Sequence, residues 1–198
     1  MGDLAAHEMI DGNETTIARY RIDARQSRFV VQPEATGLLS VFGHNPTIAI
    51  CGFGGDARFI SGTLQQASLL LLVQSGSLAL VSESSDKDRH EIERAMRDEV
   101  LEIARYPEII FMSKSITANR MTEDQYQVRI IGSLSLHGLT REQLIDARVN
   151  VNEAGLRAQG EFTLRQSDYN IKPVSALGGT LKVKDDLRLS FDIIARQS

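Results

Sequence analysis

Histidine and cysteine are the residues of this sequence that could ligate a metal or act as catalytic groups near neutral pH. The chain contains four histidines, His7, His44, His90 and His137, and Cys51 is its one cysteine. No two of them stand at the spacing of a metal-binding motif such as HxxxH or CxxC. We therefore predict no metal site, and the alternative is a site that joins His44 and His137 in space.

Nucleophilic and acid–base catalysis have no recognisable motif in the sequence. The chain lacks the Gly-x-Ser-x-Gly segment that presents a nucleophilic serine. Gly178–Gly179 precedes no Lys-Ser or Lys-Thr pair, so it does not resemble a phosphate-binding loop. We expect no catalytic residues and no cofactor. The alternative is a small-molecule enzyme in which His44 or His137 is a general base.

Composition and charge narrow the class of partner. The 198 residues are 42% hydrophobic and 24% charged, as in one globular domain. With 22 basic and 26 acidic residues, the chain lacks the basic surplus that nucleic-acid binding needs. The longest aliphatic run, Leu69–Val73, is five residues long, whereas a membrane-spanning helix needs about 20. We expect neither a nucleic-acid partner nor an integral membrane segment.

The first 16 residues differ in character from the rest of the chain. Residues 1–16 are polar and aperiodic, which predicts a flexible N-terminal arm before a single domain at 17–198. The arm has neither the positive start nor the apolar stretch of a secretory signal. A single cysteine also excludes an internal disulfide, so we expect a cytoplasmic location.

Alternation with period 2 dominates the remainder of the sequence. In Val128–Leu136 the apolar residues other than Ile131 share one face with Gly132, opposite Arg129 and Ser133. Such alternation predicts a strand with one buried face. Turn-forming residues at Met121–Asp124 and Asn152–Gly155 predict hairpins between such strands. The same alternation recurs at Ala147–Val151, Leu156–Leu164 and Leu187–Ile193.

One segment has helical spacing instead. Between Asp88 and Ile103, apolar residues recur every three or four positions, which predicts an amphipathic helix. Ser85 or Asp86 is expected to cap its N-terminus, and Pro107 lies beyond its end. The apolar stripe is expected to pack on the sheet and comprises Ile92, Ala95, Met96, Val100 and Ile103.

Many antiparallel strands with one helix predict an all-β fold. A closed barrel of about eight strands has no exposed sheet edges, and a sandwich is the alternative. Small residues at Gly132, Ala158 and Gly160 on the inward faces are expected to leave volume unfilled. In the alternative, the glycines only allow the strands to curve. Leu69–Val73, apolar on both faces, is typical of a strand that is covered on its outer side.

Several segments in order resemble one known family. They include YPEIIFMS at Tyr106–Ser113, GSLSLHGLTR at Gly132–Arg141 and the terminal strand at Asp185–Phe191. Over roughly Ile17 to Arg196, the chain resembles the YceI-like family of polyisoprenoid-binding proteins. The resemblance implies a lipocalin-like barrel with a helix, a long apolar cavity for an isoprenoid or similar chain, no catalytic residues and a homodimer. Where the family often reads Asp-Phe-Gly-Ile, Asp168–Ile171 reads Asp-Tyr-Asn-Ile.

We therefore predict a non-catalytic barrel that binds an isoprenoid or other long-chain lipid, as a carrier, a sequestering protein or a stress-related protein. Burial of about 0.8 kcal/mol per CH₂ group would supply affinity without directional chemistry. The alternatives are an enzyme acting at the barrel mouth and a packed scaffold barrel without ligand. The predicted ligand-binding side chains face inward on four strands: Phe111, Val128, Ile130, Leu134, Ala158, Phe162, Leu164, Leu189 and Phe191.

Overall fold

The structure is a computed structural model that describes residues 17–36, 46–172, 175–176 and 181–198. The predicted N-terminal arm, His44 and Gly178–Gly179 lie outside the described residues.

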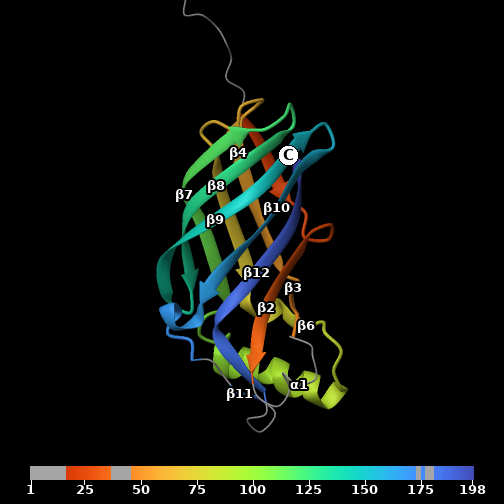
Figure 1. Ribbon diagram of the computed structural model, residues 1–198, viewed down its shortest axis with the longest axis vertical. Helices are drawn as coiled ribbons and strands as arrows, with labels where there is room; N and C mark the ends of the chain where they lie inside the picture. The colour runs from red at the N-terminus through yellow and green to blue at the C-terminus, as the bar shows by residue number, and fades with distance from the viewer. Residues whose placement is uncertain (1–16, 37–45, 173–174, 177–180) are drawn as a thin grey trace, which may run out of the picture.

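The strands close into one antiparallel barrel of eight strands with one main helix, as the sequence predicts (Figure 1). The last strand, β12, pairs with β10 and also with the first strand, β1. These two pairings close the ring. No sandwich forms. In spatial order the ring consists of β1 (Ile17–Ile22), β4 (Phe53–Ile60), β5 (Ser68–Gln74), β7 (Glu108–Arg120), β8 (Gln125–Leu136), β9 (Leu139–Asn152), β10 (Gly155–Arg165) and β12 (Leu181–Gln197).

One edge of β12 is shared by two successive strands. Its end, at 195–197, pairs with β1, and residues 182–192 pair with β2 (Arg28–Thr36). The chain moves from β1 to β2 through a turn in which Ser27 donates to the Asp23 carbonyl (2.7 Å). The Ser27 hydroxyl also accepts from the Ile194 N–H (2.9 Å), which ties the turn to β12.

A smaller extension of the sheet lies beside the helix end of the barrel. Strand β2 pairs with β3 (Ile48–Ile50), and β3 pairs with β6 (Leu78–Leu80). A 3₁₀ turn, η2 (Ser75–Ser77), joins β5 to β6. A second one, η4 (Gln166–Tyr169), follows β10, and the short β11 (Ser175–Ala176) pairs with β12.

The predicted alternation is confirmed in the barrel strands. Along β8, every second residue from Tyr126 to Leu136 faces the interior, and the residues between them are more exposed. On the outer face, Arg157 donates to both Asp192 oxygens (2.8 and 2.5 Å). This bond lowers the pKa of the Asp192 carboxyl. Because such pairs are exposed, they contribute little to stability. Burial of the inward apolar face stabilises the fold.

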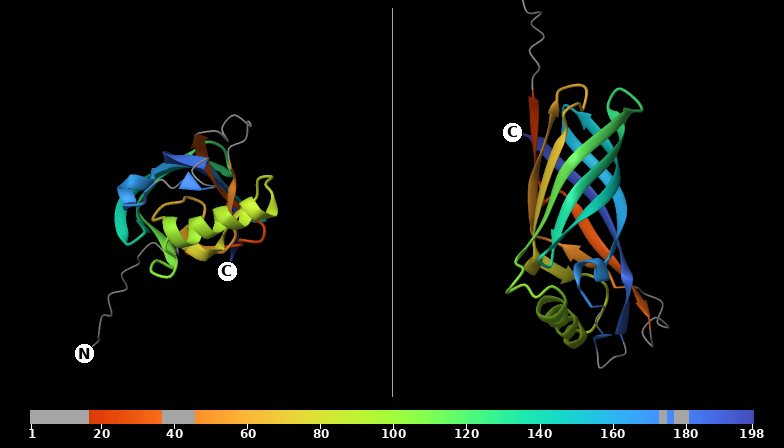
Figure 2. Two further views of the ribbon diagram at one scale, coloured as in Figure 1. Left: turned by 90° about the horizontal axis from the view of Figure 1, so that it is seen from below. Right: turned by 90° about the vertical axis from the view of Figure 1, so that its left-hand side faces the viewer.

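The expectation that Leu69–Val73 is covered on both sides is wrong. Leu69, Leu71 and Val73 pack against the core from inside the barrel. Leu70 and Leu72, on the outer face, are 37% and 40% exposed. The helix lies against β6 and across one end of the barrel, so it does not cover the outer face of β5 (Figure 2).

The helix begins where the sequence predicts and ends earlier. Helix α1 (Asp86–Ala95) starts after Ser85, whose hydroxyl accepts from the Asp88 N–H (3.1 Å). It continues as a π-helical turn, η3 (Met96–Val100), and not to Ile103 as predicted. In this wider turn the Leu101 N–H donates to Met96 O (2.9 Å). Glu102 then adopts a φ of +44°, which is incompatible with a continuing helix.

Helix α1 closes one end of the barrel. Ala95 and Met96 are buried against the core, as the predicted stripe requires. Two side chains also bind the free edge of β6. Glu93 Oε1 accepts from the Leu80 N–H (3.0 Å), and Arg89 donates to Leu80 O (3.2 Å). These bonds satisfy the N–H and C=O groups of Leu80, at an edge that would otherwise be open to pairing with other chains.

No helix in the described part of the chain has the length and apolar character needed to cross a bilayer.

Met96→Asp tests the packing of the helix. We expect it to lower the free energy of unfolding by roughly 3 kcal/mol or more, because it places a carboxylate among apolar side chains. Arg97→Asp is the control, because residue 97 is exposed, and it should cost less than about 1 kcal/mol. Urea unfolding followed by circular dichroism measures both. Equal stability of the two variants would contradict the packing described.

Candidate functional site

The barrel encloses an apolar cavity. Its volume is about 310 Å³, at the lower end of the range of about 300–1,000 Å³ usual for ligand pockets. Barrel strands form its side wall, and Met96, Val100 and Leu101 close it from the helix end. A wall of this composition can bury an apolar molecule but offers few directional contacts.

All nine side chains predicted from the sequence lie on this wall. That they contact a ligand remains a prediction. They come from β7 (Phe111), from β8 (Val128, Ile130 and Leu134), from β10 (Ala158, Phe162 and Leu164) and from β12 (Leu189 and Phe191).

The prediction that Gly132 and Gly160 leave empty space is wrong. A Cβ atom at Gly132 would collide with the ring of Phe111. One at Gly160 would lie 2.7 Å from Cζ of Phe191 and 2.5 Å from the Asp146 carbonyl. The glycines therefore admit aromatic rings from neighbouring strands.

Sequence reasoning missed part of the wall. Phe29 and Val31 of β2 line the cavity, as do Phe59 of β4 and Leu71 of β5. Alternation at Phe29 and Val31 could have identified β2. The face of β5 could not be chosen, because that strand is apolar on both sides.

A hairpin closes the end of the barrel away from the helix. Leu64, between β4 and β5, is buried although its φ is +53°, a strained value for a residue with a side chain. Nearby, the rings of Tyr20 and Phe59 stack with centroids 5.2 Å apart. Tyr126 donates to Gly62 O (3.4 Å) and ties β8 to the hairpin. Leu64 is therefore held in place as part of the cavity wall.

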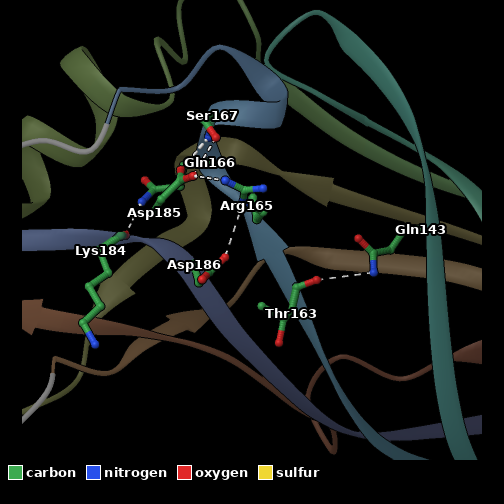
Figure 3. Close-up of polar contacts among 8 residues, drawn as sticks. All are labelled: Gln143, Thr163, Arg165, Gln166, Ser167, Lys184, Asp185 and Asp186. Carbon is green, nitrogen blue, oxygen red and sulfur yellow. Dashed lines mark hydrogen bonds and ion pairs between the residues drawn. The ribbon is translucent and has the colours of Figure 1, made fainter.

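Gln143 and Gln166 are polar side chains on a wall that is otherwise largely apolar. Gln166 is buried and donates to Lys184 O (2.9 Å; Figure 3). Gln143 precedes Ile145, Ala147 and Val149, which are buried on the inward face of β9, and it continues their alternation. The other polar wall residues, Arg58 and Ser68, are exposed. The sequence signal for Gln143 is a glutamine at an inward position of the alternation.

His137 braces the helix end of the barrel and does not line the cavity. Its Nδ1 lies 3.1 Å from Tyr169 O, and its Nε2 lies 2.7 Å from Glu102 Oε2. Its ring packs 4.5 Å from the ring of Tyr106. Tyr106 also lies against Gly138, where a Cβ atom would come 2.7 Å from Cε1 of Tyr106. This histidine therefore joins the β8–β9 turn, η4 and the loop after η3.

In the Asp168–Ile171 segment, Asn170 occupies the position at which the family that the sequence resembles often has glycine. Asn170 adopts a left-handed φ of +56°, which asparagine tolerates better than most residues. The Tyr169 side chain is buried, and this burial, with the charge of Asp168, raises the pKa of its phenol.

The described residues contain no group of three or more histidine, cysteine, aspartate or glutamate side chains able to hold a metal ion. Cys51 is exposed. The absence of a metal and of a cofactor remains a prediction.

Comparison with known proteins identifies relatives of the whole domain. The model of the YceI-like domain matches residues 20–195. BcnA of Burkholderia cenocepacia has a TM-score of 0.67 at 16% identity, covering 87% of this chain and 98% of that one. A polyisoprenoid-binding domain from Saccharophagus degradans, implicated in plant cell wall breakdown, has a TM-score of 0.64 at 13% identity, with coverages of 90% and 98%. No curated protein matches the sequence.

Ala158→Phe tests whether the cavity is empty space. We expect the ring to occupy the cavity and to weaken binding of the apolar dye N-phenylnaphthylamine about tenfold or more. The melting temperature should change by less than about 2 °C. The control is Gln159→Phe, which places the same ring on the exposed face of β10 and should leave binding unchanged.

A packed interior would give a different result. Overpacking costs about 1–3 kcal/mol, so Ala158→Phe would melt well below the parent protein. That loss, in a protein that takes up no dye, would contradict the cavity.

Proposed function

The chain belongs to the YceI-like domain family, and on that premise we propose that it binds an isoprenoid or other long-chain lipid and catalyses no reaction. The observation that carries the proposal is the apolar cavity inside the closed barrel. The Saccharophagus degradans neighbour is described as a polyisoprenoid-binding domain, which supports the same class of ligand.

Burial of the lipid chain can supply the affinity. About ten buried CH₂ groups contribute roughly 8 kcal/mol before ordering costs, comparable with the roughly 8.2 kcal/mol of a micromolar complex. Phe111, Phe162 and Phe191 add aromatic surface to the wall. Because this driving force is non-directional, it suits a carrier or a sequestering protein that accepts related chains.

The structure weighs against both alternatives from the sequence. A packed scaffold barrel would not enclose a cavity of about 310 Å³. An enzyme with His137 as general base needs a ring nitrogen facing the cavity. Both ring nitrogens of His137 instead face acceptors on Tyr169 and Glu102, away from the cavity wall. A stress-related role and the cytoplasmic location remain predictions.

Extraction of the purified protein tests the proposed function. We expect mass spectrometry of a chloroform–methanol extract to show a long-chain lipid in near-stoichiometric amount. Because a ligand that binds only the folded state stabilises it, the stripped protein should melt at a lower temperature, and added lipid should restore the original value. A protein that carries no lipid and binds no added chain would contradict the proposal.

We also propose that two copies associate through an aliphatic patch on the outer face of β5 and β7, formed by Leu70, Leu72, Ile110 and Met112. Leu70 is paired across the strands with Met112, and Leu72 with Ile110. Met112 is 58% exposed. Adjacent exposed aliphatic side chains of this kind favour burial against another protein surface. The homodimer implied by the family resemblance would provide that surface.

Leu72→Lys tests this association. We expect it to convert a dimer into a monomer, because it would bury a charge in an apolar interface. Gln159→Lys is the control, because it adds the same charge on the outer face of β10. Size-exclusion chromatography with light scattering measures the mass. A wild-type protein that is monomeric at every concentration would contradict this proposal alone.

A further inference from the structure

The barrel wall has a break in its backbone pairing between β9 and β10. Their register runs from the hairpin to the pair Asp146–Glu161 and ends there. Beyond this point β9 continues to pair with β8, and β10 continues to pair with β12. The facing edges of residues 139–145 and 162–165 therefore do not pair with each other.

Side chains bridge this break. Gln143 Nε2 donates to its neighbour Leu144 O (2.9 Å) and, over a longer distance, to Thr163 O (3.4 Å) on β10 (Figure 3). Nearer the helix end, Arg141 Nε donates to Asp168 O (3.2 Å). One side-chain bond joins β9 to β10 here, and a second joins β9 to η4.

A polar hollow lies against the same part of the wall. Arg141, Glu142, Thr163, Arg165, Asp168 and Asp186 line it. Gln143 and Leu164 belong both to this hollow and to the apolar cavity inside. These two side chains therefore stand between the polar hollow and the interior.

We propose that Gln143 and Leu164 form a lateral portal of the cavity and that the polar hollow receives the uncharged, hydroxyl-bearing head group of a long-chain lipid alcohol. The inference rests on the proposed function, because it presumes that the lipid chain lies in the cavity. It adds where the chain enters and which head group is recognised.

The charges of the hollow favour an uncharged head group. Two guanidinium groups face three carboxylates, and one of these, Glu142, also binds Lys114 (3.2 Å), so the charges around the hollow balance. Both guanidinium groups are engaged, because Arg141 binds Asp168 O and Arg165 lies 3.5 Å from Asp185 and 3.7 Å from Asp186. A phosphate would therefore find no excess of positive charge in this hollow.

The hydrogen-bonding groups favour a hydroxyl. The amide nitrogen of Gln143 is used within the wall, and no donor among the described residues approaches its Oε1. A hydroxyl group can donate to this oxygen. Gln143 could therefore accept a hydrogen bond from the hydroxyl group of a lipid alcohol whose chain lies in the cavity.

The head-group assignment is tested with ligands of one chain length. Hexadecanol, hexadecyl phosphate and hexadecane are compared by displacement of N-phenylnaphthylamine. We expect the wild-type protein to bind hexadecanol about tenfold more tightly than either of the others. Gln143→Leu should remove the advantage over hexadecane and leave hexadecane affinity unchanged. The matched control Gln159→Leu, on the exposed face of β10, should keep the advantage.

The results separate this inference from the proposed function. If none of the three ligands binds, the proposed function fails. If hexadecane binds as tightly as hexadecanol, or if Gln143→Leu keeps the preference for the alcohol, the head-group site is wrong while lipid binding stands. Tighter binding of hexadecyl phosphate also overturns the assignment.

Entry through the wall is tested by exchange kinetics. Gln143→Ala should raise the rates of dye uptake and release about tenfold, because it removes the bridge to Thr163. Leu64→Ala opens the hairpin end of the barrel and tests the competing route, and Gln159→Ala, on the exposed face of β10, is the control that should leave both rates unchanged. Unchanged rates in Gln143→Ala, or faster exchange in Leu64→Ala alone, overturn the lateral portal.

Discussion

Closure of the sheet along β12 is the interaction on which the rest of the molecule depends. A strand buried in a sheet must pair the N–H and C=O groups of both its edges. The long β12 gives one edge to β10 and divides the other between β1 and β2. The turn at Asp23–Ser27 makes this division possible, because it lets one strand succeed another along a single edge. Without closure, β1 and β10 would leave edges open to other chains.

Closure also creates the interior that the function requires, and the ends of the barrel then need separate solutions. Helix α1 covers one end with Met96 and holds the edge of β6 through Glu93. A strained Leu64 fills the other end. The side wall of the barrel has a gap in its backbone pairing, because β9 and β10 separate after the pair Asp146–Glu161. The proposed portal lies where this ladder is interrupted.

The motifs that resemble the family have a structural explanation in the brace around His137. Tyr106 comes from the first motif, and His137 and Gly138 from the second, yet their side chains and backbone pack together. Each motif supplies part of one cluster of contacts, in which His137 also lies within hydrogen-bonding distance of Tyr169 O and Glu102 Oε2. A histidine that could act as a base or a metal ligand thus serves to join three connecting segments, because both its nitrogens already face acceptors.

The sequence by itself determined the inward faces of β8, β10 and β12 and narrowed the N-terminal cap of the helix to Ser85 or Asp86, because alternation and capping are set by neighbouring residues. Only the tertiary structure decided that Phe111 and Phe191 fill the space above Gly132 and Gly160. It also decided that the helix ends in a π-helical turn and that Leu70 and Leu72 remain exposed. The separation of β9 from β10 after Asp146–Glu161 was also decided only by the tertiary structure. These outcomes depend on contacts between segments far apart in the chain, which no local pattern of residue types records.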